Sequence, residues 1–311
     1  MLIRGVNFTG YYQYDVNDPQ TCLNRINQIK LSGANTVRLP WGANTQYGRD
    51  YTVLDALMQR ITDQKMIVMV EFHEITCASL TVANIQNATN YWTSPNVLAV
   101  LKKYEKYLIL NIANEVGNDF GGNTVSVRQK LIDAYTPSIT ALRNAGLKCP
   151  FVIDAPDCGQ NIEALVQAAP TLLANDPDHN IVFSAHAYWN NDNYTTRLTN
   201  AANTAVTNNI CLIIGEFSVA QDCPLAAQAN DYAAIVAVCN TKGVGYLAWE
   251  WGGSRQYGGD GNICPDDSRG LGYSRLTMSG SSGSFANILG WGIPVKNDIL
   301  ASSVESCQFN P

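Results

Sequence analysis

Two glutamates each stand at the end of a short apolar segment, where their carboxyl groups could work as a pair. Glu115 closes the segment 110–115, directly after Asn114, and Glu216 closes the segment 213–216. Cleavage of a glycosidic bond uses two carboxyl groups that flank the bond. A lone glutamate at a strand end is often only a solvated or ion-paired carboxylate. The hypothesis of a catalytic pair therefore requires that both glutamates face one site.

Aromatic, amide and acidic residues follow the other apolar segments, and positively charged residues are scarce among them. Aromatic faces cover the apolar faces of sugar rings, while acids and amides hydrogen-bond to sugar hydroxyls. This mixture favours a neutral sugar polymer as the bound partner. The candidate substrate-binding residues are Arg38, Trp41, His73, Asn114, His186, Tyr188, Trp189, Trp249 and Trp251.

Several of these positions also have an ordinary structural explanation. His73 and His186 could be buried and satisfied by hydrogen bonds, and Trp41 could belong to the packing. Glu71 could form a structural pair, and Asp154 is expected to order a loop.

Eight short apolar runs alternate with helical patterns along the chain. The runs are continuous rather than alternating, as in strands that are buried on both faces of a parallel sheet. The predicted strands are 2–7, 35–39, 66–72, 107–112, 151–154, 181–184, 210–214 and 244–248. The first predicted helix begins at Pro19 and ends before Gly33. The other predicted helices cover 52–64, 126–144, 161–168 and 225–240.

Eight such strand–helix units predict an α/β fold, a single-domain (β/α)8 TIM barrel over residues 1–311. An open doubly wound sheet is the alternative, but no GxGxxG motif follows the first strand. Catalytic residues of such barrels lie at the C-terminal ends of the strands. The fourth and seventh strands face each other across a closed barrel, so Glu115 and Glu216 are expected to meet over its mouth.

The composition limits the classes of partner. Apolar residues make up 46% of the 311 residues, enough for a large core, and charged residues make up 15%. A low charge content with many Asn, Thr and Ser residues is common in exported proteins, so we expect a secreted protein. The net charge of −6 argues against a nucleic acid partner. We expect no membrane span, no cofactor and no metal, and a monomer.

The chain contains nine cysteines and no CxxC pair, which argues against a zinc ribbon or a thioredoxin-like site. Several disulfides in an oxidising compartment are expected. Because nine is odd, at least one thiol is free or pairs outside the chain. The first residues lack the features of a leader peptide, and we hypothesise that Met1 stands where a leader was removed.

The two glutamate segments resemble the two signatures of glycoside hydrolase family 5. They read Leu-Asn-Ile-Ala-Asn-Glu over 110–115 and Ile-Ile-Gly-Glu-Phe over 213–217. Further matches follow in order at 4–7, 33–38, 90–92, 142–146 and 247–249, so the resemblance spans almost the whole chain. It is closest to the bacterial β-1,4-mannanase branch of that family.

The resemblance implies a retaining endo-acting enzyme in which Glu115 is the general acid/base and Glu216 is the nucleophile. It implies that Arg38 steadies the nucleophile and that Tyr188 hydrogen-bonds to it. Arg38 and the tyrosine would keep Glu216 ionised, while Glu115, which is less compensated, would keep its proton.

The resemblance also implies roles for residues that surround the two glutamates. Asn114 would bind the substrate 2-hydroxyl, and His186 would neighbour the acid/base. His73 would line the subsite of cleavage, and Trp249 would form its aromatic floor.

The sequence departs from the mannanase pattern around the sugar subsites. Residues 71–74 read Glu-Phe-His-Glu instead of Glu-Val-His-Asp, and residues 218–223 lack the usual glycine and histidine. Glu250 replaces a serine, and residues 254–270, which include Cys264, are expected to form a long eighth loop. These changes affect the expected substrate more than the expected reaction.

Three alternatives to the mannanase function remain. An endo-1,4-β-glucanase would use the same scaffold and the same two glutamates. A metal-dependent hydrolase could use His73, His186 and Glu216 together with Glu71, but no HxH or HExxH motif is present. A carbohydrate-binding barrel without catalysis is the third.

Overall fold

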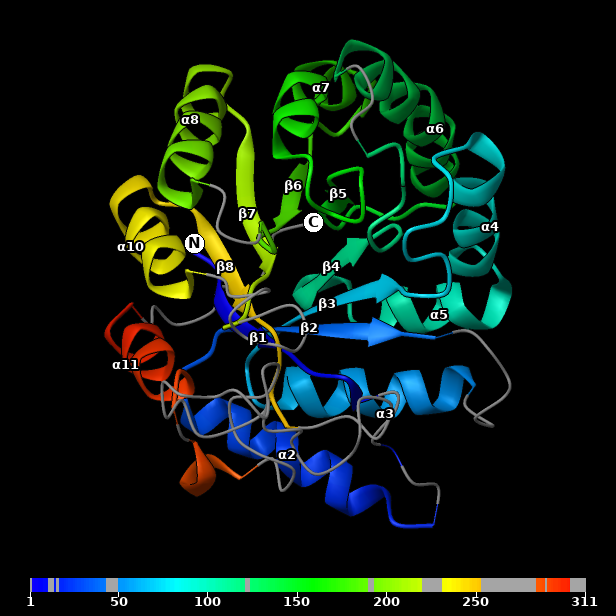
Figure 1. Ribbon diagram of the computed structural model, residues 1–311. Coiled ribbons are helices and arrows are strands. Elements are labelled where there is room, and N and C mark those ends of the chain that lie inside the picture. The colour runs from blue at the N-terminus through cyan, green and yellow to red at the C-terminus, as the bar shows by residue number, and fades with distance from the viewer. Residues whose placement is uncertain are drawn as a thin grey trace.

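The computed structural model describes residues 2–10, 14, 17–42, 50–120, 124–189, 193–219, 231–252, 284–288 and 290–302. Its strands are parallel, each pairs with the next, and β8 pairs with β1, so the sheet closes into a barrel (Figure 1). The strands are β1 (Arg4–Asn7), β2 (Thr36–Trp41), β3 (Ile67–Phe72), β4 (Leu108–Asn111), β5 (Phe151–Asp154), β6 (Ile181–His186), β7 (Cys211–Glu216) and β8 (Gly245–Ala248).

Helices form a ring around the strands in Figure 1. They cover the outer face of the sheet, which explains why the strand residues are buried on both faces. The α-helices are α2 (Pro19–Leu31), α3 (Tyr51–Asp63), α4 (Val82–Trp92), α5 (Pro95–Lys103), α6 (Thr124–Asn144), α7 (Ile162–Asn175), α8 (Tyr194–Thr207), α10 (Tyr232–Lys242) and α11 (Gly292–Ser302). Two 3₁₀ turns are η2 (Glu105–Tyr107) and η4 (Phe285–Asn287).

Local sequence signals explain where several helices begin and end. The side chains of Asp18, Asp50 and Asp231 accept hydrogen bonds from backbone N–H groups in the first turns of α2, α3 and α10. Pro19 occupies the first position of α2, where its missing N–H costs nothing. At the other end of α10, Gly243 adopts a left-handed conformation (φ 69°) that favours glycine.

The TIM barrel predicted from the sequence is confirmed, and all eight predicted strands are present with ends that differ by two residues or fewer. The predicted end of one helix is wrong, because α7 continues through Pro170 to Asn175. The helices α4, α5, α8 and α11 were not predicted. The predicted helix 225–240 corresponds to α10 from Tyr232, and residues 225–230 lie outside the described residues.

Side chains fill the inside of the barrel. Near the N-terminal ends of the strands, these side chains form an apolar cluster that is separate from the core between the sheet and the helices. Its members are Ile3, Ile67, Met69, Ile109, Val152, Val182, Ile213 and Leu247. This layer closes the bottom of the barrel, so the mouth at the C-terminal ends is the open end.

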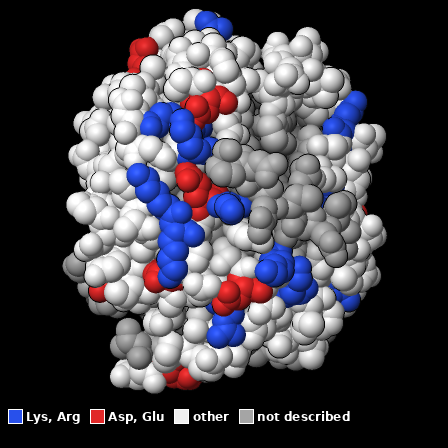
Figure 2. Space-filling view, turned by 180° about the vertical axis from the view of Figure 1, so that it is seen from behind, with Lys and Arg blue, Asp and Glu red and all other residues white. Residues whose placement is uncertain are grey.

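The outer surface carries little charge. On the face shown in Figure 2, lysines and arginines lie beside acidic side chains, and most of the described surface carries neither. Among the helices of the described residues, none has the length and apolar character that crossing a bilayer requires.

Candidate active site

The C-terminal ends of seven strands place polar side chains together inside the mouth. All of them are at most 4% exposed. They are Asn7, Arg38, Glu71, Asn111, Asp154, His186 and Glu216. Buried charges are costly unless they are paired, so such a concentration indicates a site and not ordinary core.

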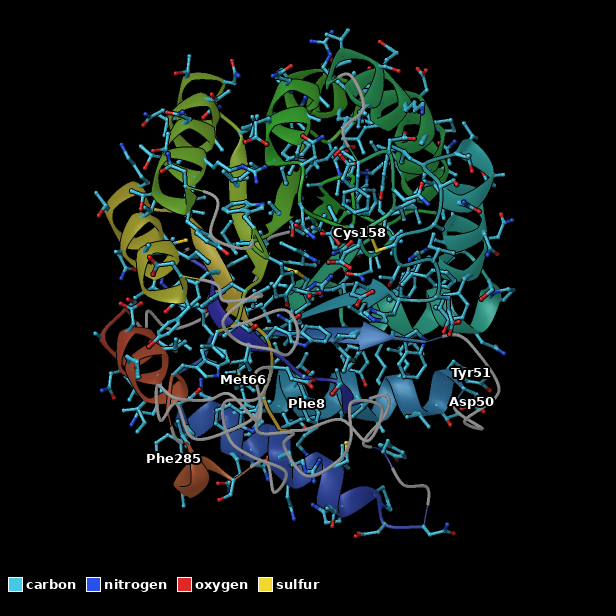
Figure 3. All side chains as sticks on the ribbon, viewed as in Figure 1. Phe8, Asp50, Tyr51, Met66, Cys158 and Phe285 are labelled. Carbon is cyan, nitrogen blue, oxygen red and sulfur yellow. A yellow bond between two sulfur atoms is a disulfide. The ribbon has the colours of Figure 1, made fainter. Side chains whose placement is uncertain are left out.

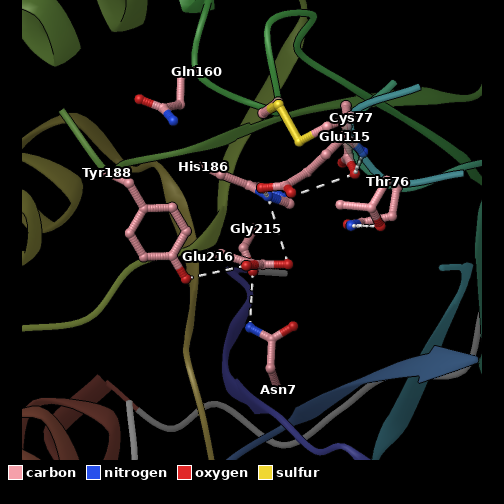
Figure 4. A network of polar contacts seen from close by, with 12 residues as sticks. Asn7, Thr76, Cys77, Glu115, Gln160, His186, Tyr188, Gly215 and Glu216 are labelled. Carbon is pink, nitrogen blue, oxygen red and sulfur yellow. Dashed lines mark hydrogen bonds and ion pairs between the residues drawn. A yellow bond between two sulfur atoms is a disulfide. The ribbon is translucent and has the colours of Figure 1, made fainter. Parts of the chain in front are cut away.

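Glu216, the last residue of β7, is held by three side chains, two of which, Tyr188 and His186, are labelled in Figure 4. Arg38 Nη1 donates a hydrogen bond to its Oε1 at 2.6 Å, and the Tyr188 hydroxyl donates to its Oε2 at 3.1 Å. His186 Nδ1 lies 3.5 Å from Oε1. Both contacts that the sequence predicted for this carboxylate, from Arg38 and from Tyr188, are present.

Glu115 follows β4 in a tight turn and has a left-handed backbone conformation (φ 51°). Its side-chain Oε1 lies 2.6 Å from His186 Nδ1. One oxygen of Glu115 and one of Glu216 also lie within 4.8 Å of each other. The two glutamates therefore meet over the mouth as predicted, with His186 in contact with both.

A disulfide closes over the turn that carries Glu115. Cys77, after β3, is bonded to Cys158, after β5, and the bond is visible in Figures 3 and 4. The backbone N–H of Cys77 donates to the carbonyl of Glu115 at 3.0 Å, and that of Cys158 donates to the carbonyl of Gly117 at 2.8 Å. The turn is therefore bracketed on both sides. The sequence did not predict this pairing.

The remaining cysteines do not test the expectation of several disulfides. Cys223, Cys264 and Cys307 lie outside the described residues, as does the loop 254–270. Cys149 and Cys239 are buried beneath the helices.

The crowding of charges shifts the pKa values of several groups in the site, His186 and Glu216 among them. Burial disfavours the charged form of His186, but the negative charge of Glu216 and those of two further carboxylates outweigh burial and raise its pKa to about 9. The surrounding carboxylates thus favour the cationic imidazole, whose Nδ1 lies within hydrogen-bond distance of Glu115 Oε1. Burial raises the pKa of Glu216, and the positive charges of His186 and Arg38 act in the opposite direction. The expectation drawn from Arg38 and the tyrosine alone left out this desolvation.

Three more predicted residues line the site. Asn114 Oδ1 accepts a hydrogen bond from Arg38 Nη2 at 2.6 Å, and its amide donates to Thr76. His73 is hydrogen-bonded to Glu71 at 2.6 Å. The rings of His73 and Trp249 are stacked, with centroids 6.3 Å apart. Their functions stay predictions, since these contacts alone do not test substrate binding.

The structure does not bring Trp41, Trp189 and Trp251 to the surface of the mouth. Their exposed fractions are 0%, 3% and 0%. Trp41 Nε1 donates to the Tyr91 hydroxyl, and Trp189 Nε1 donates to the carbonyl of Gln160. These contacts are those of packed side chains, so substrate binding by the three tryptophans stays a prediction.

Asp154 has more contacts in the site than the sequence suggested. It lies close to Arg38 and His186 and accepts a hydrogen bond from the backbone of Glu115. Asn7 and Asn111 were also missed as members of this network. The available signal was position, because Asn7 and Asp154 end predicted strands and Asn111 is the residue before the end of one.

Glu115, His186 and Glu216 form the one group of described residues whose ligand atoms are close enough to hold a metal. Glu115 Oε1 and His186 Nδ1 are engaged with each other, and the two oxygens of Glu216 are engaged with Arg38 and Tyr188. We therefore interpret the group as an acid–base cluster.

The family follows from this fold and this site. Residues 3–255 match the family model described as Cellulase (glycosyl hydrolase family 5). The chain belongs to glycosyl hydrolase family 5, which confirms the resemblance seen in its glutamate segments.

Curated relatives are similar over most of this chain. A mannan endo-1,4-beta-mannosidase from Streptomyces lividans is 31% identical over 74% of this chain and 57% of its own length. Another, from Cellvibrio japonicus, is 28% identical over 81% of this chain and 58% of its own length. The chain thus spans a little over half the length of these relatives.

Solved structures of mannanases have the same fold. The crystal structure of a beta-mannanase from Streptomyces thermolilacinus has a TM-score of 0.77 and 26% identity, and the match covers 98% of this chain and 93% of that one. A mannotriose complex of the Thermomonospora fusca beta-mannanase has a TM-score of 0.76 and 25% identity, with 98% and 93% covered.

Proposed function

We propose that this protein is a retaining endo-1,4-β-mannanase in which Glu216 is the nucleophile and Glu115 is the general acid/base. The observation that carries the proposal is the meeting of the two carboxylates, with oxygens within 4.8 Å, at the mouth of a closed barrel. Retaining enzymes hold their carboxyl groups about 5–5.5 Å apart, and inverting enzymes hold them about 6.5–9.5 Å apart to leave room for water.

The contacts of each glutamate support this division of roles. Arg38 and Tyr188 both donate to Glu216, which suits a carboxylate that must attack the anomeric carbon. Glu115 receives only the imidazolium of His186 at its Oε1, which leaves Oε2 to carry the transferred proton. Once Glu216 is esterified, its negative charge is gone, and Glu115 can take a proton from the attacking water.

The choice of mannan as substrate rests on the relatives. The Streptomyces lividans and Cellvibrio japonicus proteins are mannan endo-1,4-beta-mannosidases, and the Thermomonospora fusca enzyme was solved with mannotriose. The alternative is an endo-1,4-β-glucanase. A bifunctional relative, a beta-mannanase/endoglucanase A from Caldicellulosiruptor saccharolyticus, is 29% identical over 62% of this chain.

Release of reducing sugar from β-mannan and from carboxymethylcellulose tests the substrate. We expect faster release from mannan, whereas faster release from carboxymethylcellulose would select the glucanase. NMR of the first product tests the mechanism, because double displacement yields the β-anomer before mutarotation. An α-anomer as first product would contradict it, and saccharide binding without turnover would favour a binding barrel.

We also propose that the chain acts as a secreted monomer with one catalytic domain. Polysaccharides are too large to enter a cell, and a disulfide, a bond that forms in oxidising compartments, lies beside the turn of Glu115. Size-exclusion chromatography with light scattering tests the monomer. Detection of activity in the medium of the producing cells tests secretion.

A further inference from the structure

Asp154 is a fully buried carboxylate at the end of β5, between the two halves of the site. Its Oδ1 accepts a hydrogen bond from Asn111 at 2.9 Å. Its Oδ2 accepts from the backbone N–H of Glu115 at 3.2 Å and lies 3.4 Å from Arg38 Nη2. It also lies 3.6 Å from His186 Nε2. The Asp154 carboxylate thus contacts the backbone of Glu115. It also contacts Arg38 and His186, which both lie beside Glu216.

The contact with the backbone matters because Glu115 has a left-handed conformation. A residue other than glycine adopts such a conformation only when its surroundings fix it. The Asp154 carboxylate accepts the N–H of this turn from inside the barrel. The disulfide side of the turn fixes its carbonyl group through Cys77. The direction of the Glu115 side chain is therefore set from both sides.

The contact with the imidazole places His186 between two acids. Asp154 faces Nε2 at 3.6 Å, and Glu115 accepts from Nδ1 at 2.6 Å. A cationic imidazole favours the charged form of a carboxylic acid beside it. A negative charge on the far side of the ring offsets this effect.

We propose that Asp154 is a positioning residue for the acid/base, which fixes the backbone of Glu115 and balances the charge of His186 on the side of the ring that faces away from Glu115. This proposal rests on the proposed function for its catalytic consequence. The geometric part stands without it. The charged and titratable groups that surround the imidazole in this cluster are Arg38, Glu71, His73, Glu115, Asp154, Tyr188 and Glu216.

The first test is the pH profile of mannan hydrolysis in Asp154→Asn. The asparagine keeps an oxygen for the N–H of Glu115 but removes the charge. Loss of this anion lowers the pKa of His186, whose imidazole is in contact with Glu115. The imidazole therefore loses its charge at a lower pH, and the alkaline limb of the profile is expected to move to lower pH by about one unit. A lower rate with the limb unmoved would mean a structural role only and would overturn the proposal.

Asp176→Asn is the matched control. Asp176 is also fully buried and pairs with an arginine, Arg143, at 2.8 Å, but it lies after α7, away from the mouth. Its variant is expected to lose stability and to keep the alkaline limb of the wild type. A limb that moves equally in both variants would contradict a specific effect of Asp154.

The second test does not need activity. The chain has three histidines, so ¹⁵N-histidine NMR gives three resolvable imidazoles. In the wild type, His186 is expected to be a cation at pH 8, and in Asp154→Asn its pKa is expected to fall while that of His179 stays. A neutral His186 at pH 8 in the wild type would overturn the proposal even if the variant does not fold. If the wild type cleaved no glycan, the proposed function would fail, and this titration would still decide the role of Asp154.

Discussion

The two layers inside the barrel differ in chemistry although the same strands build them. Met69, Ile109 and Val152 belong to the apolar layer, and Glu71, Asn111 and Asp154 stand two residues further along the same strands. Side chains two positions apart share one face of a strand, so both sets point inward. The apolar layer and the ionic layer are therefore separated by two residues, or about 7 Å, along each strand.

The difference separates stability from function. The apolar layer gains from burial, whereas the ionic layer must offset the desolvation of several charges and gains little net stability. Substitutions in the ionic layer should therefore lower the activity per folded molecule, whether or not they also lower stability. Substitutions in the apolar layer should lower stability and leave the activity per folded molecule in place.

The largest effect is expected for Glu216→Ala in the ionic layer. Loss of the nucleophile should lower kcat at least about a thousandfold with folding intact. Azide should then trap a glycosyl azide of inverted configuration, because the anion enters the space of the missing carboxylate. Glu163→Gln, which removes a surface carboxylate paired with Arg197, is the control with unchanged activity. Wild-type rates in Glu216→Ala would refute the assigned role.

Arg38→Met should have the next largest effect. The variant leaves Glu216, Glu71 and Asp154 without their shared cation, and breaking a buried pair costs about 3–5 kcal/mol. Urea unfolding measures this loss, and activity per folded molecule should fall too. Arg143→Met breaks the buried pair with Asp176 below the barrel and should cost similar stability while the folded fraction stays active. An equal loss of activity per folded molecule in both variants would show that the effect of Arg38 on activity is only a consequence of lost stability.

Leu247→Ala tests the apolar layer itself. Leu247 is fully buried in the lower cluster, and removal of such a side chain costs about 2–5 kcal/mol of unfolding free energy. The pH profile of activity should stay in place because no charge changes. A displaced pH profile would show that the two layers are coupled.

The smallest effect concerns the pH dependence of stability. The pKa of His186 is raised from 6.5 to about 9 in the folded state, so its contribution is fully present below pH 6.5 and is lost as pH rises through 9. The difference in Tm between the wild type and His186→Gln should therefore shrink between pH 6 and pH 10. If the Tm difference grew between pH 6 and pH 10, the pKa of His186 would be lowered by folding and not raised.

The barrel and its two glutamates could be predicted because both leave local signals. Apolar runs such as 151–154 give the strands, and the residue at the end of each run gives the candidate site. The helix α8 was missed because its first turn follows Asn193, which makes no side-chain cap. The end of α7 was placed too early because Pro170 lies inside the helix.

Other features depend on contacts between distant segments. Asp154 was expected only to order a loop, since nothing near it in sequence shows that Arg38, Glu115 and His186 converge on it. The bond between Cys77 and Cys158 joins positions 81 residues apart, and nine cysteines allow many pairings. The burial of Trp251 likewise follows from packing and not from residue type.

The bridge between Cys77 and Cys158 ties the maturation of the site to the place where the chain resides. Thiols stay reduced in the cytosol, so a newly made chain there would lack this disulfide beside the turn of Glu115. Export would then do more than deliver a polysaccharide-degrading enzyme to its substrate. It would complete the disulfide beside the turn that carries Glu115, the proposed acid/base.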